Sequence, residues 1–401
     1  MHQNSAARLA FGLCMITTAV NLQAPLYGLL AAQGGVGVGA TTVAFACYVA
    51  GVMPVLLGLN GLADRVGYKA VIVFALLLNM LATFIMLIAP GMVMLGVARF
   101  LLGIGTALAS AVAPAYMHAL WKGENKSAAT SYVTISSALG FGLGAAATSV
   151  FIFQSPSLTP PSLWLYLCVS TVALAGVLTL NDAVPVAPSG KMLRLPSFPA
   201  GTICFGLAIL IAWAAVGLVI AILPSALSLH GLGAWSGFAV FGICSGGVLF
   251  QPWARRLSPY RATHLGLMIL PPAYGLIAWG ALVGNLPTLL LGTLAASSAC
   301  YGFIYLGGLS GVLALAGTSA TQASAGYLLM AYIGFSLPVV STGMLIDRLG
   351  YSAALMLFGS VLLAAVLVAI RLLAQLRLHA SQRGPASVGM VTLFSPHTNK
   401  E

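Results

Sequence analysis

One arginine falls well inside an apolar stretch, and it is the residue with the clearest chemical potential. Arg99 lies between Leu95 and Gly105, in a run with no other charged side chain. An ionised group inside hydrocarbon is costly unless it faces protein or water and meets carbonyl oxygens or an anion. If Arg99 faces a cavity, it attracts an anionic or carbonyl-bearing molecule.

Acidic side chains are scarce, which argues against several chemistries. The sequence has five: Asp64, Glu124, Asp182, Asp347 and Glu401. None lies in the middle of an apolar run, so we expect no proton relay through a buried carboxylate. His118 and His264 are alternative proton carriers, but both fall at the ends of apolar runs. No paired catalytic carboxylates, Ser-His or His-Glu-x-x-His arrangement or phosphate loop is present, so we expect no enzyme and no catalytic residue.

Cysteine, methionine and histidine do not predict a metal or cofactor site. His264 and Met268 are four residues apart, a spacing that suits Cu(I). One such pair is too few ligands, so copper uptake is a minor alternative function. The six cysteines lie in apolar runs without paired spacing, as small core residues do: Cys14, Cys47, Cys168, Cys204, Cys244 and Cys300.

The composition places the chain in a lipid bilayer. Of 401 residues, 60% are hydrophobic and 5% are charged, and the mean hydropathy is +1.04. Soluble domains carry about a quarter charged residues. A membrane helix needs roughly 20 apolar residues, so the chain has room for about a dozen. Apolar runs bounded by Gly, Pro and charge predict twelve helices, near 9–32, 37–59, 69–89, 92–118, 127–152, 161–181, 200–224, 233–252, 262–283, 287–313, 320–345 and 351–377.

The net charge of +11 follows from topology and does not indicate a nucleic-acid partner. If the N-terminus is cytoplasmic, fourteen of the sixteen basic residues fall in segments on the cytoplasmic side. Arg99 and Arg348 are the exceptions. We therefore expect a multi-pass protein of the inner (plasma) membrane with both termini in the cytoplasm.

A polar, proline-rich segment divides the predicted helices into two groups of six. It covers residues 182–198 and reads as a cytoplasmic linker. The N-terminal half is then expected at 1–181 and the C-terminal half at 199–378. Residues 379–401 are polar without an apolar period and predict a disordered cytoplasmic tail.

The loop after the second predicted helix is short and charged. Its residues resemble the corresponding loop of the major facilitator superfamily, with Asn60 and Tyr68 in place of Gly and Arg. The resemblance implies that the loop gates the cytoplasmic side and that Asp64 caps the helix beginning near Ser319. The alternative is a topological anchor that keeps the loop in water. The implied gating residues are Asp64, Arg65, Gly67 and Lys69.

A second motif, Leu95-x-x-x-Arg99-x-x-Leu102-Gly103-x-Gly105, resembles the helix 4 pattern of the same superfamily, with Leu102 in place of Gln. The resemblance implies an all-α polytopic fold of twelve transmembrane helices in two pseudo-symmetric six-helix bundles. In that fold Arg99 either faces the substrate cavity or donates to carbonyls of the first helix and helps closure on the outer side.

Helices 1, 4, 7 and 10 line the central cavity in this superfamily. On helix 1, Thr17 and Asn21 share one face, and Gln23 and Tyr27 share another roughly 160° away, so both pairs cannot line the cavity. Asn21 lies nearer the midplane and is preferred. The aromatic candidates have packing or lipid contact as alternative roles. The predicted substrate contacts are Asn21, Arg99, Trp213, Tyr301 and Tyr305.

Together these patterns predict transport of a small organic solute by alternating access. Arg99 without an acidic partner favours an anionic or polar solute, and likeness to efflux-type members favours export. The alternatives are multidrug efflux of lipophilic compounds, copper uptake and a non-transporting membrane assembly protein. Ala145 stands where drug-proton antiporters have proline, which counts against drug efflux. Expected partners are a small-molecule substrate, the bilayer and, if transport is coupled, an ion. We expect a monomer and no nucleic acid.

Overall fold

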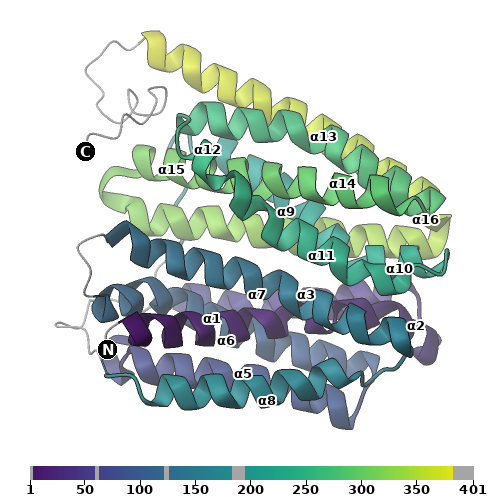
Figure 1. Ribbon diagram of the computed structural model, residues 1–401. Coiled ribbons are helices and arrows are strands. Elements are labelled where there is room, and N and C mark those ends of the chain that lie inside the picture. Colours follow the sequence, from purple (N-terminus) through teal and green to yellow (C-terminus); the bar gives the residue numbers. More distant parts are fainter. Residues whose placement is uncertain (1–2, 59–62, 122–125, 183–194, 383–401) are drawn as a thin grey trace. The chain divides into compact units, whose positions relative to one another are not determined.

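All regular secondary structure in the part of the chain that the structure describes is helical. This computed structural model describes residues 3–58, 63–121, 126–182 and 195–382 (Figure 1). No strand is present in these ranges. The α-helices are α1 (Gln3–Leu22), α2 (Tyr27–Gly34), α3 (Val38–Gly58), α4 (Ala63–Val66), α5 (Tyr68–Ile88), α6 (Met92–Leu120), α7 (Lys126–Gln154), α8 (Pro161–Leu178), α9 (Ile203–Ala221), α10 (Leu223–Ser228), α11 (Ser236–Ser245), α12 (Gln251–Ala254), α13 (Pro259–Val283), α14 (Leu286–Ser297), α15 (Tyr305–Ala316) and α16 (Ala320–Gln382).

By length and apolar composition, ten continuous helical stretches of the described chain qualify as membrane spans. The last, Leu286–Leu378, is 93 residues long, and we divide it into three spans of at least the roughly 20 residues that one crossing needs. Gly317 (φ 51°) and Gly350 (φ 81°) separate them, because a positive φ ends one helix before the next begins. The described chain therefore holds the twelve predicted spans, and the all-α transmembrane fold is confirmed.

The helices form two compact units, which we describe separately. Unit 1 comprises Met1–Arg194 and Leu227–Phe241, and unit 2 comprises Leu195–Ala226 and Gly242–Glu401. Most of the predicted linker (182–198) and tail (379–401) lies outside the described residues, so both stay predictions.

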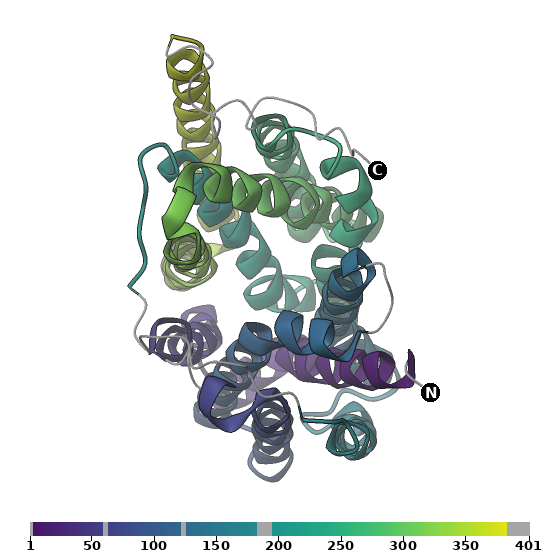
Figure 2. The same ribbon diagram turned by 90° about the vertical axis from the view of Figure 1, so that its left-hand side faces the viewer.

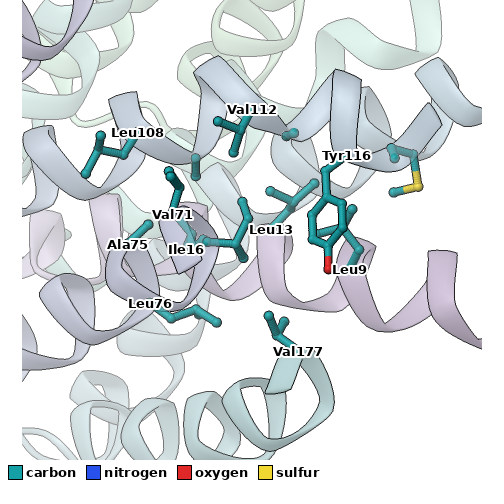
Figure 3. Close-up of a cluster of buried hydrophobic side chains, with 14 of the residues drawn as sticks. Leu9, Leu13, Ile16, Val71, Ala75, Leu76, Leu108, Val112, Tyr116 and Val177 are labelled. Atoms are coloured by element: carbon teal, nitrogen blue, oxygen red, sulfur yellow. The ribbon is translucent and has the colours of Figure 1, made fainter. Parts of the chain in front are cut away.

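The core of unit 1 is a cluster of apolar side chains from α1, α5, α6 and α8 (Figure 3). Each of the longer helices contributes a stripe of residues three or four positions apart. Figure 2 gives the same helices in a view turned by 90° about the vertical axis. The labelled core residues are at most 5% exposed: Leu9, Leu13, Ile16, Val71, Ala75, Leu76, Leu108, Val112, Tyr116 and Val177.

Glycines bring α3 and α6 unusually close together within unit 1. A Cβ added to Gly103 on α6 would meet the backbone oxygen of Tyr48 on α3. In return, a Cβ added to Gly51 on α3 would meet the backbone oxygen of Phe100 on α6. Small residues allow such backbone approach between membrane helices. Arg99 lies one turn before Gly103. This helix contact therefore sets the position of Arg99 along α6 and the direction in which its side chain extends.

The helix pair α1 and α7 is built in the same way. A Cβ on Gly140 would meet the backbone oxygen of Cys14, and one on Gly144 would meet that of Thr18. Asn21 strengthens this contact, because its Nδ2 donates to the backbone oxygen of Phe141 at 2.9 Å. The glycines of the predicted fifth span therefore have a packing role.

The first predicted span, 9–32, is not one continuous helix. It ends as α1 at Leu22, continues as a 3-10 turn over Ala24–Leu26 and resumes as α2. Pro25 favours the break, because it has no N–H to donate to the carbonyl four residues earlier. Irregular backbone at membrane depth is tolerated where it is buried in protein or lines a cavity.

Two further spans contain irregular turns, and both turns lie within unit 2. The predicted helix 287–313 has a π-helical turn over Ser298–Ile304, between α14 and α15. The predicted helix 233–252 has a 3-10 turn over Gly246–Phe250, between α11 and α12. The two turns pack against each other. π-helical turns occur frequently at functional sites, which draws attention to Tyr301.

Candidate functional site

Arg99 is fully buried within the described structure, with 0% of its surface exposed. Its Nη1 donates to the backbone oxygen of Val20 on α1 at 2.6 Å. The guanidinium carbon lies 4.7 Å from the ring centroid of Phe45 and 5.0 Å from that of Tyr48, both on α3. The positive charge is therefore held by one carbonyl and two aromatic rings.

Among the described side chains, no carboxylate neutralises Arg99. The two described acidic side chains are Asp182, which follows α8, and Asp347, which lies beside the Gly350 kink. The Nε and Nη2 atoms of Arg99 are buried and have no hydrogen-bond partner. These two nitrogens form one edge of the guanidinium, the fork that binds a carboxylate through two parallel hydrogen bonds.

The broken first span carries further buried polar atoms in the residues after Val20. Val20, Gln23 and Tyr27 are three and four residues apart, so they occupy one face of the chain. Gln23 and Tyr27 are 0% exposed, and both amide atoms of Gln23 and the Tyr27 hydroxyl lack hydrogen-bond partners. The positive charge of Arg99 interacts electrostatically with the Tyr27 hydroxyl. We call Gln23, Tyr27 and Arg99 the Arg99 cluster.

The sequence alone did not decide which face of the first span meets Arg99. It separated Asn21 from Gln23 and Tyr27, and preferred Asn21 on depth. The structure turns Asn21 towards α7 and places the Gln23 face on the side of Arg99. The spacing from Val20 to Tyr27 was visible in the sequence, but nothing there showed which carbonyl Arg99 contacts.

Unit 2 holds an aromatic cluster around Trp213. The centroid of its ring lies 6.2 Å from that of Tyr301, 5.3 Å from that of Tyr332 and 5.6 Å from that of Phe335. The Trp213 Nε1 atom is buried without a hydrogen-bond partner. Tyr332 and Phe335 were not predicted, because they lie on α16, in the eleventh span, which was not expected to line the cavity.

The third predicted aromatic residue, Tyr305, packs against a tyrosine of α16. The ring of Tyr305 lies 6.5 Å from that of Tyr327. The Tyr327 hydroxyl contacts the backbone oxygens of Ile304 and Tyr305 at 3.1 and 3.2 Å. Tyr305 therefore takes part in a contact between α15 and α16.

Comparison with known proteins identifies the family. A family model described as Major Facilitator Superfamily matches residues 9–337. The chain belongs to the Major Facilitator Superfamily. It is therefore a membrane transporter of a solute and not an enzyme. No curated protein matches its sequence.

Solved structures of other transporters share this superfamily fold. The nucleoside transporter NupG, in a mutant form, is 11% identical with a TM-score of 0.75, over 92% of this chain and 99% of that one. A mutant peptide transporter POT is 15% identical with a TM-score of 0.70, over 92% and 94%. The human organic anion transporter MFSD10 (TETRAN) is 17% identical with a TM-score of 0.64, over 93% and 99%. Identities this low show the fold alone.

The superfamily's loop motif is described only in part. The side chain of Asp64 and residues 59–62 lie outside the described part, so the cap on the helix near Ser319 stays a prediction. Arg65 is exposed and Lys69 is half-buried. Gly67 precedes α5 with φ 84° and ψ 155°. The carboxylate of Asp182 lies beside it, at the positive end of the α5 dipole.

Replacing Gly67 with alanine should destabilise the loop by about 2 to 3 kcal/mol, because its φ and ψ are open essentially to glycine alone. The added Cβ would also lie 3.0 Å from Asp182 Oδ1. Gly35→Ala is the matched control: Gly35 has φ 59° with nothing within 4 Å, and a left-handed alanine costs about 1 kcal/mol. Apparent melting temperatures in detergent compare the two. Equal decreases would show that the Gly67 backbone is not specially constrained.

The predicted copper pair is not part of a larger ligand set. His264 stacks on Tyr260, with ring centroids 5.9 Å apart, and Met268 is 55% exposed. In the part of the chain that the structure describes, no group of three or more His, Cys, Asp or Glu side chains is placed to hold a metal ion.

Proposed function

We propose that this transporter moves a small organic anion whose carboxylate binds the Nε and Nη2 edge of Arg99. The observation that carries the proposal is a buried guanidinium with one edge bound to Val20 and the other edge unpartnered. Burying an ionised group costs several kcal/mol after relaxation. One charge-assisted hydrogen bond returns about 1.5 to 3 kcal/mol and each aromatic face about 0.5 to 2. A bound carboxylate would offset much of the remaining cost of burying the charge.

Gln23 and Tyr27 complete the proposed site. The Tyr27 hydroxyl can donate to the second face of a carboxylate, and the Gln23 amide can both donate and accept. A polar group next to the carboxylate on the substrate would satisfy Gln23. This set of donors favours an organic acid over a lipophilic cation, because no described acidic side chain is available to attract the cation.

The proposed site is closed in this conformation, because the unpartnered atoms of Arg99, Gln23 and Tyr27 have no surface exposed to water. We therefore propose alternating access: the helices around Arg99 separate towards one side, the anion enters, and the site later opens to the other side. We favour export, with both termini in the cytoplasm and the protein acting as a monomer in the inner membrane. The basic residues on one side support this orientation.

A matched-ligand screen tests the substrate class. The purified transporter is mixed with organic acids, their neutral methyl esters, sugars, lipophilic cations and copper, and its melting temperature is measured. Acids that stabilise it are then tested for exchange in proteoliposomes, with empty liposomes as control. We expect the acids to stabilise and exchange, and their esters to do neither. Stabilisation and movement of lipophilic cations, with no effect of acids, would overturn the proposal.

A further inference from the structure

One end of unit 2 is strongly basic. Described arginines lie just before α13, in its first turn and near the end of α16: Arg255, Arg256, Arg261, Arg371 and Arg377. Helices α13 and α16 are antiparallel here, because Tyr274 contacts Leu355 whereas Tyr260 contacts Arg377. The single described acidic residue of unit 2, Asp347, lies near the start of this antiparallel segment and hence at the other end. The basic end therefore has no described carboxylate of its own unit to balance it.

An aromatic contact orders part of this basic end. The guanidinium carbon of Arg377 lies 5.6 Å from the ring centroid of Tyr260. The imidazole of His264, one turn further along α13, stacks on the same ring with an interplanar angle of 21°. A cation over an aromatic face is held by the ring quadrupole. Tyr260 therefore gathers Arg377 of α16 and His264 of α13 at one place.

The final segment of α16 is longer than a bilayer needs. From residue 351 to residue 382 it is helical, which at about 1.5 Å per residue gives roughly 48 Å. The hydrocarbon core is about 30 Å thick. The end of α16 that carries Arg377 therefore extends into the headgroup region. Leu378 is 63% exposed beside it, so this extension offers both a cation and an apolar side chain.

Exposed apolar side chains continue from this place towards the middle of the bilayer. On α13, Leu265 is 40% exposed and Met268 is 55% exposed. On α16, Leu367 is 53% exposed and Val368 is 48% exposed. A molecule with an anionic head and hydrocarbon chains matches both features, because its head would meet the arginines while its chains lie along these residues.

We propose that Arg261, His264 and Arg377 bind the phosphate of an anionic phospholipid at the headgroup level of α13 and α16. Arg261 and Arg377 are exposed and can donate to phosphate oxygens, and Tyr260 holds Arg377 in place. Basic pockets between membrane helices bind anionic headgroups in this manner. This lipid site shares no residue with the Arg99 cluster. A negative result for the proposed substrate would therefore leave the lipid proposal unchanged.

Lipid titration of the full-length protein in detergent tests the site. Phosphatidylglycerol, phosphatidylcholine and inorganic phosphate are added separately, and bound lipid is counted by native mass spectrometry while the melting temperature is followed. We expect phosphatidylglycerol to bind and stabilise, and the other two to do neither. Equal binding of phosphatidylcholine would overturn the proposal, and so would equal stabilisation by inorganic phosphate, which would indicate a site for a soluble anion.

Variants locate the lipid on the protein. Arg377→Gln and Arg261→Gln should each weaken phosphatidylglycerol binding about five-fold, the effect of one surface arginine near an anionic membrane. Tyr260→Leu keeps every charge but releases Arg377, so it should also weaken binding. The control is Arg348→Gln, an exposed arginine beside the Gly350 kink. If Arg348→Gln weakens binding as much as the other two arginine variants, the attraction is general and the proposed site is wrong.

Discussion

Replacing Arg99 with glutamine should reduce transport of an organic acid at least 100-fold while the helices stay assembled. The substitution removes two proposed hydrogen bonds to the substrate carboxylate, each worth about 1.5 to 3 kcal/mol because a charge is involved. Each 1.4 kcal/mol corresponds to about ten-fold. The measurement is exchange of the labelled acid in proteoliposomes, normalised to the amount of reconstituted protein.

Arg99→Lys separates charge from geometry. Lysine keeps a positive charge that can donate to the Val20 carbonyl, but it lacks the planar fork. We expect it to transport better than Arg99→Gln and at least about ten-fold worse than the native protein, the loss of one of the two hydrogen bonds. Arg348→Gln controls for loss of an arginine elsewhere. Native transport by Arg99→Lys would show that a point charge suffices.

A purely structural Arg99 makes a different prediction. If its only task is to join α6 to α1 through Val20, then Arg99→Gln should lower the melting temperature of the ligand-free protein and leave the affinity for the acid unchanged. If it binds the anion, the ligand-free melting temperature should change little or rise, because an unpaired buried charge is removed. Stabilisation by the acid should then disappear. These two measurements together distinguish the readings.

Replacing Gly103 with alanine should destabilise the protein by about 3 kcal/mol, at the upper end of the cost of over-packing. The added methyl group would meet the backbone oxygen of Tyr48, which cannot rotate away as a side chain can. Helices α3 and α6 would have to separate, and the Phe45 and Tyr48 rings would move away from Arg99. We therefore expect a lower melting temperature and weaker transport together.

Gly96→Ala is the matched control for this prediction. Gly96 lies on the same helix and faces the same neighbour, but its added Cβ would be 3.6 Å from Cys47 Sγ, an ordinary contact. Alanine is also the better helix former by up to about 1 kcal/mol. We expect Gly96→Ala to melt at or slightly above the native temperature. Equal destabilisation by both substitutions would mean that the α3 and α6 approach at Gly103 does not limit stability.

The two predictions are linked through one local arrangement. Because Gly103 and Gly51 let α3 approach α6, the rings of Phe45 and Tyr48 reach the guanidinium of Arg99. Without that approach, the two rings would not contact the guanidinium, and the hydrogen bond to the Val20 carbonyl would remain. The position of the charge is therefore set by helix packing as well as by its place in the sequence.

The predicted substrate contacts remain predictions. The structure shows why the sequence does not indicate which side chains of a membrane helix face the protein interior. On α5, Phe74 is 51% exposed and Leu77 is 47% exposed, whereas Ala75 and Leu76 are fully buried. All four are apolar, because the lipid-facing side of a membrane helix is as hydrophobic as the protein-facing side. The polar stripe that reveals the outer face of a helix in a soluble protein is missing here.

The sequence by itself determined the twelve spans and the superfamily. In the bilayer core the backbone N–H and C=O groups can hydrogen-bond only to one another, so every long apolar run must become a helix. The loop and helix 4 motifs identify the superfamily because they are short local patterns. The tertiary structure decided which side chains meet. It broke the first span at Pro25, turned Asn21 towards α7, placed Gln23 and Tyr27 on the face of Arg99, and surrounded Trp213 with Tyr301, Tyr332 and Phe335. Those contacts depend on how helices distant in sequence approach each other, and a uniformly hydrophobic sequence does not specify that approach.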